Sequence, residues 1–251
     1  MLVAYKIGLM LALGLALIYA FQRFYPESMS FFSNVFPPVI AGTAVVSSGL
    51  ALRKYGRNLR ERFSLIWLGF TLGMLLWFLG ETCWAIYALL LNVEIPYPSI
   101  ADAFWLAGYV PFFIALQQYV KTFASVLSRR ILGTIMFSVF ASSVLVSAIL
   151  ITPIIGAEQD LVTLLVDFAY PLLDLVLLAA AILGLAIFSK GSLGKSWLLI
   201  NAGISLDVVA DILFSYTTAQ GIYYNGHPLE LLYHCGYILF TLAFYAHKKE
   251  L

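Results

Sequence analysis

Charged residues are scarce in this chain. Only 11% of its 251 residues are Asp, Glu, Lys or Arg, against roughly 25% in an ordinary soluble domain. Hydrophobic residues make up 62% of the sequence, and the mean hydropathy is +0.95. A soluble fold of this length could not bury so much apolar surface. The composition therefore excludes a cytosolic globular enzyme, a nucleic-acid-binding protein and a disordered chain, and it predicts an all-α polytopic membrane protein.

Residues and motifs that common chemistries require are also missing. The three histidines, His227, His234 and His247, offer no facing pair of the kind that ligates haem. No lysine lies in the middle of an apolar run, which excludes a retinal Schiff base. There is no Gly-rich phosphate loop, no HExxH and no GxSxG motif. The sequence therefore identifies neither a cofactor nor a reaction.

Long apolar runs predict eight membrane-spanning helices, because about 20 apolar residues are needed to cross a bilayer. We expect them at residues 2–21, 36–52, 64–91, 100–120, 131–151, 161–188, 197–220 and 229–247. Pro37 and Pro38 would then lie in the first turn of the second helix, where proline is tolerated. The first run is too long for a signal peptide and lacks a clear cleavage site, so we expect it to be retained.

Basic residues are distributed unevenly between these spans. Twelve of the fourteen Lys and Arg residues fall on one side, and only Arg23 falls in a loop on the other. The positive-inside rule then predicts a multi-pass protein of the cell membrane with both termini in the cytoplasm. The opposite loops carry the acids Glu27, Glu94, Glu158 and Asp160. No loop exceeds about a dozen residues by these span boundaries, so we expect a single membrane domain, residues 1–251.

Two helical hairpins in the chain resemble each other. Aligning the Gly108-Tyr109 pair with Gly236-Tyr237 places Asp102 on Glu230 and Trp105 on Tyr233. This likeness predicts two four-helix halves in parallel orientation, residues 1–125 and 126–251. Repeats of this kind often place a binding site at their interface. The alternative is that two hairpins rich in Leu, Ala and Tyr look alike without being related.

Five acidic residues are predicted inside the spans, although an acid at the bilayer centre costs about 2.5–3.5 kcal/mol. They are Glu81, Asp167, Asp174, Asp207 and Asp211. Because no basic residue lies at a comparable depth, these acids must be protonated, hydrated, bonded to polar partners or bound to a cation. The direction of each helix places the acidic set in the exterior half of the membrane.

Aromatic residues share helix faces with these acids. Trp84 follows Glu81 by three residues, and Trp105 follows Asp102 by the same spacing, which places each pair on one face. Charge pairing and cation–π contacts would suit a small cationic or amphipathic ligand. We therefore predict an exterior-facing binding pocket formed by Glu81, Trp84, Asp102, Trp105, Asp167, Asp174, Asp207, Asp211, Glu230 and His234.

Two of these acids also have a structural explanation. Ser99 and Asp102 form a capping-box pattern at the start of a helix. Glu230 lies in a first helical turn, where an acid interacts favourably with the helix dipole. Tyr and Trp near span boundaries are also typical of interfacial belts.

The two cysteines, Cys83 and Cys235, both fall in outer halves of spans. They can form a disulfide or remain buried thiols. They can also join Glu81 and His234 around a zinc ion, which makes Glu81, His234 and Cys235 the candidate metal ligands.

Four short motifs occur in a fixed order along the chain. They are PSxAD at 98–102, YPLxD at 170–174, ADxxF at 210–214 and GxYxxGxxLE at 221–230, the last with Glu230 where Asp is usual. This set resembles a multi-span N-terminal module that precedes diguanylate cyclase, phosphodiesterase and histidine kinase domains in bacterial and archaeal signalling proteins. The resemblance extends from about the third span to the C-terminus. It implies a membrane sensor or signal-input module and specifies no ligand.

No output domain follows these motifs, so we expect a stand-alone sensory module that is not itself an enzyme. It would signal to a cytoplasmic or membrane partner through the basic loops, chiefly residues 53–62, although such loops equally bind anionic lipid headgroups. One alternative is a proton- or cation-coupled transporter that uses Asp174 and Asp207 as a relay. The other is a metal-dependent intramembrane enzyme that uses His234 and Glu81. No nucleic-acid partner is expected, and the sequence does not determine the oligomeric state.

Overall fold

The computed structural model describes residues 2–55, 60–93, 95–123, 160–188 and 194–250, and scattered positions between 128 and 144. In this part of the chain all regular structure is helical, which confirms the predicted all-α class. The helices are α1 (Leu2–Ala20), η1 (Gln22–Phe24), α2 (Pro26–Tyr55), α3 (Arg62–Ala85), η2 (Ile86–Leu91), α4 (Ile100–Phe123), α6 (Leu161–Phe188), α7 (Gly194–Ala219) and α8 (Glu230–Glu250). The short helix η2 is a π-helix that continues α3.

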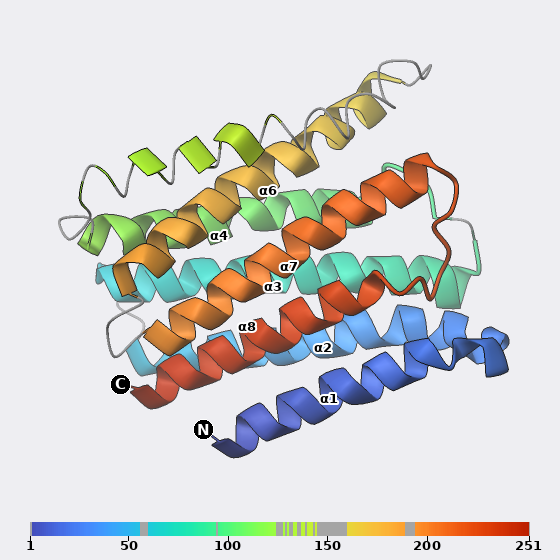
Figure 1. Ribbon diagram of the computed structural model, residues 1–251, viewed down its shortest axis with the longest axis horizontal. Helices are drawn as coiled ribbons and strands as arrows, with labels where there is room; N and C mark the ends of the chain where they lie inside the picture. Colours follow the sequence, from blue (N-terminus) through green and yellow to red (C-terminus); the bar gives the residue numbers. More distant parts are fainter. Residues whose placement is uncertain are drawn as a thin grey trace.

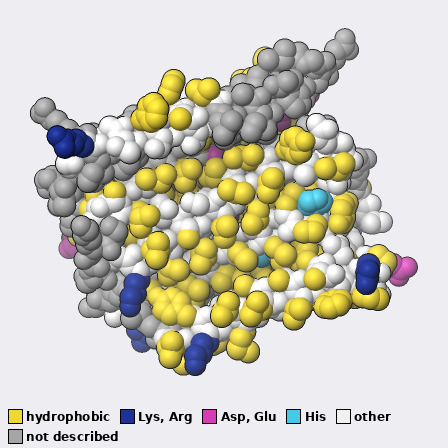
Figure 2. Space-filling model, viewed as in Figure 1, with side chains coloured by type: hydrophobic (Ala, Val, Ile, Leu, Met, Phe, Trp, Pro, Cys, Tyr) yellow, Lys and Arg dark blue, Asp and Glu magenta, His cyan; other side chains and the backbone are white. Residues whose placement is uncertain are grey.

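Six of the described helices are long and apolar enough to cross a membrane: α1, α2, α3 with η2, α4, α6 and α7. Figure 2 shows hydrophobic side chains across the middle of one face, with Lys and Arg near its edges. These features indicate a multi-pass membrane protein. The predicted span at 131–151 lies outside the described residues.

Helix α8 is not among the six, although the sequence predicts a span at 229–247. Its 21 residues extend about 31 Å at 1.5 Å per residue. It contacts α1, α2 and α7, and these neighbours shield it from lipid. A helix covered by protein can carry polar groups such as Glu230 and His234, which lowers its hydropathy without shortening it.

Helix α2 differs most from the sequence prediction. It begins at Pro26, ten residues before the predicted start at 36, and it runs for 30 residues. Pro37 and Pro38 therefore lie inside the helix and not in its first turn. The added segment carries several polar residues, of which Ser33 and Asn34 are buried and Glu27, Ser28 and Ser30 are exposed. Asn34 donates to the carbonyl of Ser30 at 2.7 Å.

The described helices form a ring. Helices α2, α3, α4, α6, α7 and α8 contact one another in that order, and α8 returns to contact α2. Helix α1 lies outside the ring against α8 (Figure 1). Both chain termini lie at the same end of the bundle. The ring encloses an interior that is filled by side chains from its helices.

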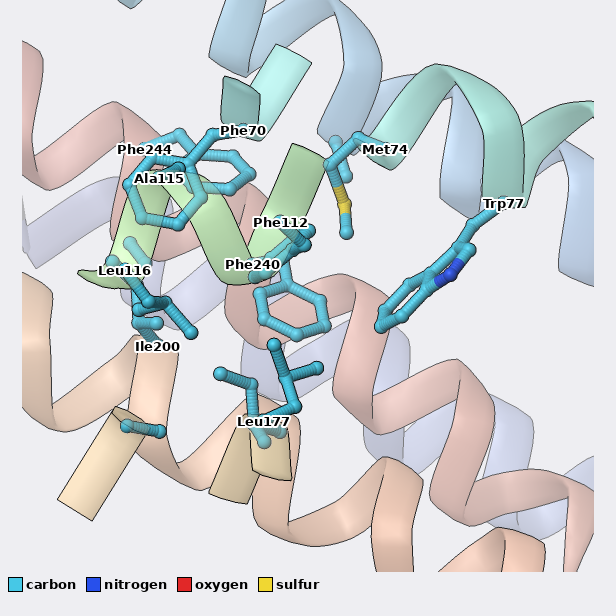
Figure 3. Close-up of a cluster of buried hydrophobic side chains, with 14 of the residues drawn as sticks. Phe70, Met74, Trp77, Phe112, Ala115, Leu116, Leu177, Ile200, Phe240 and Phe244 are labelled. Atoms are coloured by element: carbon cyan, nitrogen blue, oxygen red, sulfur yellow. The ribbon is translucent and has the colours of Figure 1, made fainter. Parts of the chain in front are cut away.

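Aromatic side chains fill much of this interior (Figure 3). Phe112 of α4 and Phe240 of α8 meet edge to face, with ring centroids 5.5 Å apart, so helices on opposite sides of the ring touch. Phe70, Trp77 and Phe244 complete what we call the aromatic cluster.

Two glycines allow helices α3 and α4 to approach closely around this cluster. A Cβ atom added at Gly73 would lie 2.6 Å from the ring of Phe112. One added at Gly108 would collide with the indole of Trp77. Only a residue without a side chain fits at these two positions.

Basic residues gather at the end of the bundle where the termini lie. The last turns of α2, α4 and α8 and the first turns of α3 and α7 meet there. Lys54 of α2 donates to the carbonyl of Lys248 of α8 at 3.1 Å. The other described basic residues at these helix ends are Arg53, Arg60, Arg62, Lys121, Lys195 and Lys249. Arg57, Arg129 and Lys190 lie outside the described residues.

The close approach of α3 and α4 yields a stability prediction. Gly73→Val forces a branched side chain against Phe112, and overpacking of this kind costs about 1–3 kcal/mol. Gly49→Val is the matched control, because a Cβ added at Gly49 meets nothing within 4 Å. Thermal unfolding in detergent should show a lower melting temperature for Gly73→Val than for Gly49→Val. Equal melting temperatures would contradict the packing described here.

Candidate functional site

A cavity of about 670 Å³ opens at the end of the ring opposite the basic residues. Its wall is built from parts of α2, α3, α4, α6, α7 and α8 that lie away from the basic end of the bundle, and from the connecting segments 95–97 and 223. Trp77 lines the cavity and belongs to the aromatic cluster, so the cluster forms the inner boundary of the cavity. Among the residues that the structure describes, no Lys or Arg lines it. We call this cavity the acidic pocket.

Nine of the ten predicted site residues line the acidic pocket: Glu81, Trp84, Asp102, Trp105, Asp167, Asp207, Asp211, Glu230 and His234. The tenth, Asp174, is not part of the wall, although it is buried and hydrogen-bonded to a residue that is. The structure thus brings residues from five helices into one site.

Asp102 begins helix α4 and also ties it to α6. Its Oδ2 accepts hydrogen bonds from the backbone N–H and the hydroxyl of Ser99 at 2.7 and 2.9 Å, which is the geometry of a capping box. Its Oδ1 accepts a bond from the hydroxyl of Tyr170 at 2.9 Å. Both oxygens are engaged, so the structural explanation of Asp102 has direct geometric support.

Glu230 has a similar position at the start of α8. It accepts hydrogen bonds from the N–H of Gly226 at 2.8 Å and from the hydroxyls of Tyr223 and Tyr19 at 3.1 and 2.6 Å. Gly226 has a φ of +93°, a conformation that L side chains rarely adopt. The hydroxyl of Tyr19 also lies 2.9 Å from Nε2 of His234. Through Tyr19, the outer helix α1 reaches the pocket wall.

Deeper in the site, three carboxyl groups accept hydrogen bonds from tyrosines of α4 and α8. Tyr237 donates to Glu81 at 2.8 Å, and Tyr233 donates to Asp211 at 2.5 Å. The hydroxyl of Tyr109 lies 2.5 Å from Asp174 and 3.1 Å from Asp211.

The Tyr109 arrangement implies a shared proton. A phenol has one proton to donate, and here it faces oxygens of Asp174 and Asp211. The second oxygen of Asp174, Oδ2, is buried without a hydrogen-bond partner among the described residues. Asp174 and Asp211 therefore act as a linked pair even though only Asp211 lines the pocket.

Asp207 stands apart from these networks. It is 7% exposed, and neither of its carboxyl oxygens has a hydrogen-bond partner among the described residues. Its Oδ1 lies directly over Gly236 of α8, where a Cβ atom would collide with it.

Aromatic rings line the outer part of the pocket. The centroids of Trp84 and Trp105 lie 5.7 Å apart, and Phe214 lies edge-on to Trp84 at 6.5 Å. At the mouth, Tyr97 donates to Asp167 at 2.5 Å. Desolvation and this bond raise the pKa of Tyr97 above its ordinary value, so its hydroxyl stays protonated at neutral pH.

The candidate metal ligands do not converge. In the part of the chain that the structure describes, no group of three or more His, Cys, Asp or Glu residues is arranged to hold a metal ion. Cys83 and Cys235 are free thiols, so the disulfide alternative is wrong for this structure. His234 interacts with Tyr19.

The tyrosine donors are the functional residues that sequence reasoning missed. A signal for them was present in the spacing. Tyr109 follows Asp102 by seven residues, and Tyr237 follows Glu230 by the same interval, which places each tyrosine on a helix face that also carries a pocket acid. Tyr19 carried no such signal, since its own helix, α1, contains no acidic residue.

No protein-family model, curated protein sequence or solved structure matches this chain.

The buried tyrosine–carboxyl bonds predict a stability effect. Tyr237→Phe removes the donor to Glu81 and leaves a carboxyl oxygen unsatisfied, which should cost about 1–3 kcal/mol. Tyr245→Phe is the matched control on the same helix, because its ring contacts Lys249 and no hydroxyl bond is described for it. Thermal unfolding in detergent should separate the two variants. A Tyr237→Phe protein as stable as Tyr245→Phe would show that the bond contributes nothing.

Proposed function

We propose that this protein is a membrane ligand-binding module of a sensory system, with the acidic pocket as its binding site. A small cationic or amphipathic molecule would enter from the exterior and bind between the carboxyl groups and the tryptophans. Binding would be passed to a cytoplasmic or membrane partner at the basic end of the bundle. This function agrees with the resemblance of the four sequence motifs to the input modules of signalling proteins.

One observation carries the proposal. Six acidic residues line the wall of one cavity together with Trp77, Trp84 and Trp105, and no described basic residue balances them. Lipid-shielded acids without bases mark functional sites in membrane proteins. A cavity of about 670 Å³ also lies within the usual size range of small-molecule sites, roughly 300–1,000 Å³.

The transporter alternative has less support. A carrier needs a polar route through the membrane, and broken helices commonly provide it. Here the aromatic cluster closes the inner side of the acidic pocket, where Trp77 belongs to both. The enzyme alternative requires converging ligands, and the described residues offer no such group.

Orientation belongs to the same proposal. The basic end would face the cytoplasm by the positive-inside rule, which places both termini inside and the acidic pocket at the exterior surface. Helix α8 would count as a span that neighbouring helices shield, and the segment 131–151 as another, giving eight in all. The two halves 1–125 and 126–251 would then enter the membrane in the same orientation.

Reporter fusions test this orientation. Alkaline phosphatase, which is active only outside the cytoplasm, should be inactive after residue 251 and active in the connection at Tyr224. Green fluorescent protein, which matures in the cytoplasm, should give the reverse pattern. The two reporters provide each other's control. The opposite pattern would place the acidic pocket at the cytoplasmic surface.

Native mass spectrometry with elemental analysis of the purified protein tests binding. We expect a retained small organic molecule and no stoichiometric zinc. Asp211→Asn should reduce its retention, because Asp211 lines the pocket. Asp160→Asn should not, because Asp160 is fully exposed and only caps α6. Stoichiometric zinc would instead favour the enzyme, and uptake of the molecule by proteoliposomes would favour the transporter.

A further inference from the structure

Asp207 is the one acidic residue in the described pocket wall that no tyrosine supports. The other five acids each accept a hydrogen bond from at least one tyrosine hydroxyl: Glu81, Asp102, Asp167, Asp211 and Glu230. A buried carboxyl without a partner is costly. Asp207 therefore lowers the stability of the folded protein in a way that its neighbours avoid, and such a residue is expected where a ligand supplies the missing partner.

Comparison of the two hairpins, α3–α4 and α7–α8, shows which residue of the first corresponds to Asp207. The rings of Trp67 and His247 lie 4.5 Å apart, and those of Trp197 and Tyr119 also lie 4.5 Å apart. Each pair joins a tryptophan of one hairpin to the second helix of the other. Two further kinds of contact also match. The hydrogen bond of Tyr237 to Glu81 corresponds to that of Tyr109 to Asp211. The packing of Phe112 on Gly73 corresponds to that of Phe240 on Gly203. These pairs support the proposed repeat and fix its register, with α3 matched to α7 and α4 to α8.

In this register Asp207 occupies the position of Trp77. Both side chains lie on a glycine of the next helix, Trp77 on Gly108 and Asp207 on Gly236. The indole of Trp77 fills its position and donates to the carbonyl of Trp105 at 3.1 Å. The carboxyl of Asp207 is smaller and has no donor to bond. The two hairpins therefore differ at this position of the pocket wall. The first has a large indole whose N–H is hydrogen-bonded, and the second has a smaller carboxyl group without a hydrogen-bond partner.

The chemistry at this position calls for a cation with N–H donors. Glu81 and Asp211 line the same cavity as Asp207, so an incoming positive charge meets three carboxyl groups there. Oxygens that lack partners need hydrogen-bond donors as well as charge. A primary ammonium group has three such donors, whereas a quaternary ammonium group has none.

We infer that the acidic pocket binds a primary organic amine, and that Asp207 is the counter-ion that accepts hydrogen bonds from its ammonium group. The apolar body of the amine then lies against Trp84 and Trp105 nearer the mouth. This inference rests on the proposed function, since it specifies the ligand class of the same pocket.

Three probes that share one apolar body test the inference: benzylammonium, benzyltrimethylammonium and benzyl alcohol. Each is titrated against purified wild-type protein, Asp207→Asn and Asp160→Asn in lipid nanodiscs, with affinity measured by calorimetry and tryptophan fluorescence. Wild type and the exposed control Asp160→Asn should bind benzylammonium about tenfold or more tighter than the other two probes, because charge-assisted hydrogen bonds are the strongest available. In Asp207→Asn this preference should disappear.

A second measurement separates a binding role from a structural one. Without ligand, Asp207→Asn should melt within a few degrees of wild type, because it replaces one partnerless buried polar group by another of the same shape and breaks no described hydrogen bond. A destabilised or unfolded Asp207→Asn protein would overturn the inference, since it would reveal a structural partner. Benzylammonium binding that Asp207→Asn leaves unchanged would also overturn it.

The outcomes distinguish this inference from the proposed function. If benzyltrimethylammonium or benzyl alcohol binds wild type as tightly as benzylammonium, the acidic pocket is a binding site but not one selective for primary amines. If none of the three probes binds wild type and no molecule is retained during purification, both the inference and the proposed function are wrong.

Discussion

The hydrogen bond from a tyrosine hydroxyl to a carboxyl group is the interaction on which this structure depends. A membrane bundle cannot hold several acids in its interior without either bases or donors. Here five acids of the pocket wall are supported by tyrosines. A phenol is well suited to this role, because its ring packs as an apolar group while its hydroxyl satisfies an acceptor. The acids can then be retained although no described lysine or arginine lines the pocket beside them.

The ring of helices explains why these bonds are possible. Six helices enclose the interior, and the aromatic cluster fills its inner part with rings from opposite sides. The outer part is left for polar groups, which every helix of the ring can reach. Helix α8 has a central role in this division. It supplies Phe240 and Phe244 to the cluster and Tyr233 and Tyr237 to the acids, so a single helix carries both layers.

The sequence predicts the class of fold and most of the site. Apolar runs locate the helices, since the solvent is lipid and lipid-facing residues must be apolar; α6 was predicted with the bounds that it has. The same reasoning places α2 ten residues too late, because its first turns carry polar residues such as Glu27, Ser28 and Ser30 and so interrupt the apolar run. Acids stand out in an apolar chain, so nine pocket residues were found from composition and helix direction. Their tyrosine donors were not, because a contact such as Tyr19 with Glu230 joins residues whose proximity only the packed fold creates.

Hydrogen bonds between residues far apart in the chain have a consequence for biogenesis. Glu81 receives its proton donor from Tyr237, a residue 156 positions later in the chain. Asp211 accepts a hydrogen bond from Tyr109, a residue 102 positions earlier in the chain. While the ribosome is still making α7 and α8, helix α3 has already been synthesised with an acid, Glu81, that lacks its donor. That acid must remain neutral, or be sheltered by the insertion machinery, until α8 is inserted. The polar network of the pocket is therefore completed only after α8 has been made and inserted.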